Sequence, residues 1–156
     1  MIQSAFYEAA NRALSEECCR LLDYTAQLDR DPAKKTAQMA EYKCAMYRYA
    51  AISNVHSRFQ QSNRLWERLS CSHYVIAPLN EALCLRPELL AEYERAADKK
   101  SAGLYLGAVA FTEQKIAECQ EQLSLASDWE AVELTERLGG YRLALKCLHN
   151  ARKETE

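Results

Sequence analysis

Cysteine and histidine are the residues of this chain whose types and spacing could support chemistry. Two Cys-x-His pairs occur, Cys71 with His73 and Cys147 with His149, and His56 could complete a site of soft metal ligands. Zinc sites usually space their ligand pairs as C-x2-4-C or H-x3-5-H. Because positions i and i+2 of a helix point to nearly opposite sides, Cys147 and His149 cannot both face one ion. Cys71 and His73, in an expected loop, are the better candidates.

A thiol enzyme or metal protein around Cys71 and His73 is therefore the third functional hypothesis. A nucleophilic thiol needs a low pKa and a neighbouring base, and only Cys71 near His73 or His56 offers that combination. The chain has no glycine-rich phosphate loop, no nucleophile elbow and no HExxH motif. Neighbouring carboxylates such as Glu16 and Glu17 fit a solvated helix face. We therefore expect no catalytic residue, no cofactor and no bound metal.

Basic and acidic residues gather in different segments. Residues 30–68 contain eight basic and three acidic residues, a net charge of +5, whereas residues 81–136 contain five basic and twelve acidic residues, a net charge of −7. The candidate basic interaction face consists of Lys43, Arg48, Arg58, Arg64 and Arg68. Basic residues with interleaved aromatics can follow a nucleic-acid backbone. A nucleic-acid-associated protein using residues 34–68 is therefore the alternative function.

Two observations weaken the nucleic-acid hypothesis. The sequence pI of about 6.0 is low for a dedicated nucleic-acid binder. Opposite charges also suit two neighbouring helices that complement each other inside one bundle, where rim charges are common and individually weak. Nucleic acid is thus the less favoured partner.

The elements that must position these residues are predicted to be helices. Apolar residues make up 49% of the 156 residues, leucine and alanine are abundant, and only four glycines and three prolines occur. Together with apolar spacing of three and four, this predicts a single all-α domain over residues 1–156, a bundle of about five helices with two of them long. Ser4 caps the first helix, whose apolar stripe consists of Phe6, Ala10, Ala13, Leu14, Leu21, Leu22 and Leu28.

The second helix is expected to follow Asp31 and Pro32 and to extend to about Ser70. Its stripe consists of Met39, Tyr42, Met46, Tyr49, Ile52, His56, Phe59, Trp66 and Leu69. A short helix is expected over residues 78–85. Residues 87–123 form one helix or two, with Ser101 as the candidate cap of the second. "SDWE" predicts a capping box of Ser127 and Glu130 before a last helix that ends near Ala151.

Paired glycines interrupt the apolar pattern of "ERLGGYRLALKCLHN". A glycine inside a helix costs about 1 kcal/mol relative to alanine, so Gly139 and Gly140 need a reason. Gly103 and Gly107 have the small-xxx-small spacing that permits a close helix approach. We expect Gly139 or Gly140 to meet Gly103 or Gly107, within the chain or between two copies. The alternative is a kink or break at the glycine pair.

Seven cysteines, an odd number in a helical chain, indicate reduced thiols rather than a disulfide framework. The first residues do not resemble a signal peptide, and no apolar run reaches the roughly 20 residues of a membrane helix. We therefore expect no membrane contact and a cytoplasmic location. If the chain is phage-encoded, we expect it in the host cytoplasm or in the virion.

The favoured function is a non-catalytic protein–protein interaction or assembly module acting through helix surfaces. Self-association fits this hypothesis, because opposite charges on two long helices could pair between copies. Small helical chains without motifs are common among phage virion and host-modulating proteins. No particular residue carries that last expectation.

Overall fold

Five helices account for the regular structure of the residues that the computed structural model describes, which are 4–29, 35–69 and 86–156. They are α1 (Ala5–Asp29), α2 (Lys35–Leu69), α4 (Pro87–Arg95), α5 (Lys99–Leu123) and α6 (Asp128–Thr155). The all-α bundle is confirmed. The expected helix over residues 78–85, the Asp31–Pro32 start and the Cys71–His73 pair lie outside the described residues.

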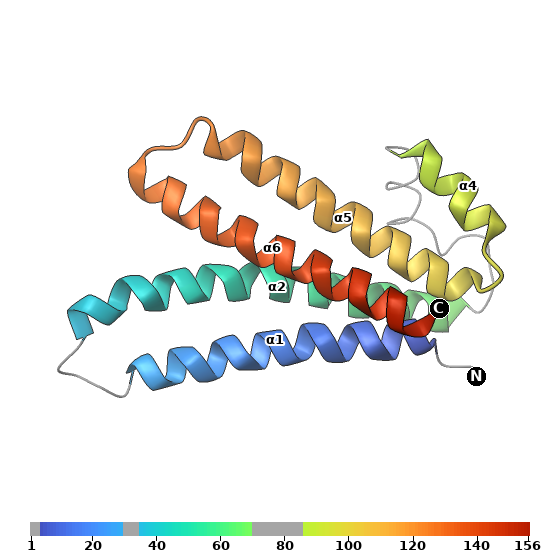
Figure 1. Cartoon of the computed structure of the whole chain (residues 1–156), viewed down its shortest axis with the longest axis horizontal. Helices are drawn as coiled ribbons and strands as arrows, with labels where there is room; N and C mark the ends of the chain where they lie inside the picture. Colours follow the sequence, from blue (N-terminus) through green and yellow to red (C-terminus); the bar gives the residue numbers. More distant parts are fainter. Residues whose placement is uncertain (1–3, 30–34, 70–85) are drawn as a thin grey trace.

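The four longer helices form two antiparallel hairpins, α1 with α2 and α5 with α6 (Figure 1). α6 makes the main contacts between the two hairpins, since it packs against α1 and α2 as well as against α5. The short α4 makes its main helix contact with α5. The start of α1 and the end of α6 lie at the same end of the molecule.

The core joins all four longer helices around an aromatic cluster. The ring of Phe6 in α1 meets Phe59 of α2 edge to face at 5.8 Å and Tyr105 of α5 at 5.5 Å. Leu14 and Leu148 are fully buried beside them. Burial of each such side chain stabilises the fold by about 1.5–3 kcal/mol, so this cluster holds the hairpins together.

The apolar stripe predicted for α1 is largely confirmed, and that of α2 is confirmed in part. Phe6, Ala10, Leu14 and Leu21 are buried, whereas Leu22 is exposed. In α2, Met39 is exposed, and the buried positions are Ala45, Ala51, Ile52, Val55, Phe59 and Asn63. Ile52 and Phe59 were expected in this stripe, and Tyr49 and Trp66 pack partly buried against the core. Ala51 was not expected, and it lies where the backbone of α6 approaches α2.

Residues 87–123 form two helices rather than one. Ala96 has extended backbone (φ −68°, ψ 134°) and ends α4, where the Lys99 ammonium donates to the Tyr93 carbonyl at 2.7 Å. Asp98, not Ser101, caps α5, because its Oδ1 accepts from the Ser101 backbone N–H at 3.1 Å. A lysine at the end of one helix and an aspartate at the start of the next suit both helix dipoles.

The first and last helix starts differ in how they are capped. The Ser4 hydroxyl accepts from the Tyr7 backbone N–H at 3.1 Å, so the expected α1 cap is confirmed. Ser127 does occupy the cap position of α6, but its side chain makes no capping hydrogen bond. The capping box is therefore wrong in its bonding. α6 also continues to Thr155, one turn beyond the expected end.

Candidate protein-interaction site

Gly140 is the point at which α6 crosses α2. A Cβ atom at this position would lie 2.6 Å from the carbonyl oxygen of Arg48 and 2.8 Å from the Cβ of Ala51. Real Cβ atoms do not approach other atoms so closely, so only glycine fits where the two backbones touch. α6 is continuous through Gly139 and Gly140, and the alternative of a helix break is wrong.

Within the chain, the partner of Gly140 differs from the one expected, and a meeting of the glycines between two copies stays a prediction. The atoms nearest to Gly140 belong to α2, so its partner is not Gly103 or Gly107 of α5. Gly139 is exposed, and a Cβ there would have no neighbour within 4 Å. Gly103 is buried and Gly107 half-buried in α5. The close crossing thus depends on one glycine of the pair.

One face of α6 includes Gly140, and the burial of its residues changes at that position. Positions spaced by three and four residues share a helix face. Here they are Trp129, Glu133, Glu136, Gly140, Ala144, Cys147 and Ala151. From Gly140 onward every member of this stripe is buried. Before Gly140 the stripe is half-buried at its two glutamates and exposed at Trp129.

The stripe loses its cover because the two hairpins separate. Two contacts lie near the point of separation: Arg48 Nε donates to Glu136 Oε2 at 2.5 Å, and the Arg137 guanidinium lies 5.5 Å from the centre of the Tyr47 ring. Toward the start of α6, the ribbons of α2 and α6 diverge (Figure 1). We define the open end as the surface formed by residues 115–137. These residues are the end of α5, the connection that follows and the start of α6.

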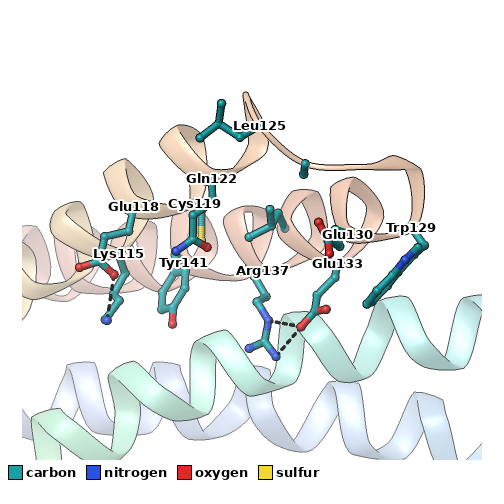
Figure 2. A pocket seen from close by; sticks show the side chains of 12 residues that line it. Lys115, Glu118, Cys119, Gln122, Leu125, Trp129, Glu130, Glu133, Arg137 and Tyr141 are labelled. Carbon is teal, nitrogen blue, oxygen red and sulfur yellow. Dashed lines mark hydrogen bonds and ion pairs between the residues drawn. The ribbon is translucent and has the colours of Figure 1, made fainter.

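A hollow of about 630 Å³ lies at the open end, between α5 and α6. Its lining residues are Lys115, Glu118, Cys119, Gln122, Leu125, Ala126, Trp129, Glu130, Glu133, Leu134, Arg137 and Tyr141. Figure 2 shows Lys115, Tyr141 and Arg137 extending from the α5–α6 hairpin toward the side on which α2 lies. The hollow therefore opens on the inner face of this hairpin, which α2 covers farther along.

Two residues that line this hollow are large, apolar and exposed. Leu125 is 86% exposed and Trp129 68%, the two highest values among the large apolar residues of the described ranges. Scattered apolar residues on a surface need no explanation, but an apolar group beside a hollow is typical of a binding site.

The charges around the hollow are predominantly negative. Residues 115–137 contain six acidic residues and two basic residues, a net charge of −4. Inside the hollow, Lys115 pairs with Glu118 at 3.0 Å and Arg137 pairs with Glu133 at 2.9 Å. Glu121, Asp128 and Glu130 are exposed and have no ion-pair partner within the described part of the chain. Glu130 lines the hollow, and Glu121 and Asp128 are exposed in the same segment, so the open end has negative charge that no ion pair compensates.

The candidate basic face of α2 is partly used inside the bundle. Arg48 pairs with Glu136 of α6, and the Arg58 guanidinium lies 4.7 Å from the centre of the Phe111 ring of α5. Lys43, Arg64 and Arg68 are exposed. Contact between basic α2 and the acidic first part of α6, residues 128–136, is the intramolecular complementarity considered above. The nucleic-acid hypothesis for residues 34–68 stays a prediction.

Most of the thiols and imidazoles of the described residues are at least partly buried. Cys18, Cys19, Cys44, Cys119 and Cys147 are free thiols, and burial raises the pKa of Cys147 to about 11. His56 Nε2 lies 2.8 Å from Asn11 Oδ1, and His149 Nδ1 lies 2.9 Å from the Tyr105 hydroxyl. In residues 4–29, 35–69 and 86–156, no group of three potential metal ligands comes together. The Cys71–His73 hypothesis lies outside these ranges and stays untested.

Sequence reasoning did not single out Trp129 or Leu125. A signal was nevertheless available, because the stripe through Gly140 contains Glu133 and Glu136 immediately before it. Carboxylates are almost never fully buried without a partner, so this half of the stripe could not belong to a closed core. A tryptophan at the far end of such a polar stretch is a candidate for exposure.

Comparison with known proteins adds no relative. The chain matches no protein-family model, no curated protein and no solved structure. None of the helices in the described ranges combines the length and the apolar character that crossing a bilayer requires.

Proposed function

We propose that this protein is a non-catalytic interaction module that binds a partner protein at its open end. The observation that carries the proposal is Trp129, which belongs to the packing stripe of α6 and yet is 68% exposed. Farther along α6, the same stripe is buried against the bundle. A partner that covered the open end would extend this packing by about two helical turns.

The residue types at the open end support a protein partner. Trp, Tyr and Arg are enriched among the residues that dominate binding energy at protein interfaces. Trp129, Arg137 and Tyr141 line one hollow, and the two intrahelical ion pairs hold Arg137 and Lys115 in defined positions. The Tyr141 hydroxyl is itself fixed, because it accepts from the Asn54 amide at 2.9 Å. Such preorganised side chains lose little conformational entropy on binding.

A comparative pull-down tests the proposal. The wild type, the double variant Trp129→Ala/Leu125→Ala and the control variant Leu90→Ala are immobilised and exposed to a native lysate, with bound proteins identified by mass spectrometry. Leu90 is a suitable control because it is also an exposed leucine but belongs to α4. A partner should be retained by the wild type and the control and lost from the double variant. Identical captured proteins for all three baits would refute binding at the open end.

A further inference from the structure

The shape of the open end indicates what kind of partner segment it accepts. The hollow occupies the angle between two antiparallel helices, and α2 is the element that fills the equivalent place beyond Gly140. A helix laid into this angle would continue the packing that α2 begins. Residues 129–137 span about 12 Å along the axis of α6, since a helix rises about 1.5 Å per residue. Two turns of a partner helix would cover this length with apolar anchors at i, i+3 or i+4, and i+7.

The charge of the open end indicates the polar face of that helix. Glu130 lines the hollow, and Glu121 and Asp128 are exposed in the same segment. All three lack ion-pair partners in the described ranges, and residues 115–137 have a net charge of −4. Lysine and arginine flanking an apolar stripe would meet these carboxylates at the rim. An acidic helix would meet repulsion at the same positions.

We propose that the open end binds an amphipathic helix of a partner protein whose polar face is basic. This proposal rests on the function proposed above and adds the chemical class of the partner. The apolar contact with Trp129 supplies most of the affinity. The acidic rim selects the charge of the partner and accelerates its association, as rim charges do at other interfaces.

Two designed peptides test the proposal directly. Both are about 15 residues long, because shorter isolated helices are marginal in water, and both have the same apolar face. One has lysines on its polar face and the other has glutamates. Trp66 and Trp129 are the two tryptophans of the chain, so in the variant Trp66→Phe the emission spectrum reports on Trp129 alone. The lysine peptide should shift the emission to shorter wavelength and saturate, and the glutamate peptide should not.

Variants then separate apolar from electrostatic recognition, with affinities measured by the fluorescence anisotropy of labelled peptide. Trp129→Ala should weaken binding of the lysine peptide about 30-fold, the scale of an interface hot spot. The triple variant Glu121→Gln/Asp128→Asn/Glu130→Gln should weaken it roughly tenfold and reduce its dependence on salt. Leu90→Ala should leave the affinity unchanged. Circular dichroism of each variant checks that the fold is retained.

The contrary outcomes are distinguishable. Equal affinity for the glutamate peptide, lost on Trp129→Ala, would overturn the basic partner and leave the proposed function intact. Absence of binding by both peptides would overturn the helix proposal, while the pull-down would still decide the proposed function. Sedimentation that showed a concentration-dependent dimer sensitive to Trp129→Ala would identify a second copy as the occupant and overturn both partner assignments.

Discussion

At the scale of single residues, the absence of a Cβ atom at Gly140 lets α6 lie directly against the backbone of α2. Its neighbour Gly139 has the opposite environment, with open space where a side chain would be. The pair therefore separates two effects that glycine has in helices. One effect is that glycine permits two helix backbones to come close together. The other is that glycine has a lower helix propensity than alanine.

Alanine substitution of each glycine should change stability in opposite directions. Gly140→Ala places a Cβ against the Arg48 carbonyl, which belongs to the backbone and cannot rotate away, so we expect a loss of about 1–3 kcal/mol from overpacking. Gly139→Ala should increase stability by about 0.5–1 kcal/mol through helix propensity. Urea unfolding of both variants measures these differences. An increase in stability for both would show that the close crossing does not exist in solution.

The cysteines provide a second contrast between neighbouring environments. Cys147 is buried, and this burial raises its pKa to about 11, so almost no thiolate is present near neutral pH. Cys19 is exposed on α1. Under native conditions Cys19 should be alkylated much faster than Cys147, as measured by peptide mapping after brief treatment with iodoacetamide at pH 8. Comparable rates for the two thiols would mean that the end of α6 is not packed as described.

The sequence predicted a close crossing at the glycine pair but not its partner. Spacing identifies a glycine that needs explanation, and it cannot specify which other helix lies opposite. Gly103 and Gly107 were natural candidates because small residues often face each other. The actual partner of Gly140 is the backbone of Arg48 and the side chain of Ala51. Arginine has a long side chain, so its presence in a sequence gives no sign that the backbone at that position contacts another helix.

At the scale of secondary-structure elements, the starts of α1 and α5 are tied together by their caps. The Ser101 hydroxyl donates to Asp98 Oδ2 at 2.7 Å, so it must accept the hydrogen of Ser4, whose oxygen lies 2.6 Å away. The Ser4 oxygen in turn accepts from the Tyr7 backbone N–H. A chain of hydrogen bonds thus runs from the first turn of α1 to the carboxylate that caps α5.

Removal of the Asp98 carboxylate should destabilise this junction. Asp98→Ala should cost about 0.5–2 kcal/mol in unfolding free energy, the usual range for an N-cap, whereas Asp98→Asn retains a capping oxygen and should cost less. Thermal unfolding monitored by circular dichroism compares the two variants. If Asp98→Ala unfolded at the wild-type temperature, the cap would contribute nothing to the stability of α5.

The same carboxylate gives an expected response to acid. Partial desolvation raises its pKa, but hydrogen bonds from the Ser101 side chain and from backbone N–H groups outweigh this, and the net pKa is lowered. A lowered pKa means that the stabilisation is present above the unfolded-state value of about 3.9 and is lost as pH falls through the folded-state value. The difference in stability between wild type and Asp98→Asn should therefore shrink below about pH 4.

His56 predicts a second pH dependence, at the contact between α1 and α2. Asn11 Oδ1 accepts a hydrogen bond from Gln60 and can only be an acceptor, so His56 Nε2 carries the proton of their 2.8 Å contact. Burial lowers the pKa of His56. Protonation then favours the unfolded chain, and stability should decrease as pH falls from about 6.5 through the folded-state pKa. His56→Gln should lack this part of the pH dependence in urea unfolding, and an unchanged profile would contradict the assignment.

Helix positions were predictable from the sequence where local signals were unambiguous. The Ser4 cap and the residues before Asp29 defined α1, and apolar spacing carried α2 to its end at Leu69. The boundary between α4 and α5 could not be decided, because Asp98 and Ser101 are both capping residue types three positions apart. Ser101 instead uses its hydroxyl to connect Asp98 with Ser4, a contact across 97 residues that no local pattern reveals.

At the scale of the whole molecule, apolar periodicity could show which residues share a helix face. It could not show at which residue that face stops being covered by other helices. The stripe through Gly140 is regular over the full length of α6. Its division into a buried and an uncovered part follows from the angle between two hairpins, which depends on the close approach at Gly140 and on contacts such as Arg48 with Glu136. The open end was therefore not predictable from apolar spacing alone.

Hydrogen exchange should reveal this division in solution. Amides of α6 between residues 132 and 137 lie where α2 has diverged, and those between 144 and 150 belong to the buried half. The first four N–H groups of a helix, counted from its N-cap, lack intrahelical partners, so residues 127–130 are left out of the comparison. Regions with few buried contacts open at low free energy, and we expect protection at least roughly tenfold lower at 132–137 than at 144–150.

The corresponding comparison within α2 is an internal control for the same experiment. Residues 39–44 should exchange faster than residues 51–59, because the former are exposed or half-buried and face the diverging region, whereas the latter include Ile52, Val55 and Phe59 in the core. Uniform protection along both helices would mean that the hairpins close against each other in solution and that the open end does not persist. Faster exchange at both helix starts, followed by slower exchange at 132–137 when the lysine peptide is added, would connect the gap between the hairpins to the binding of a partner helix.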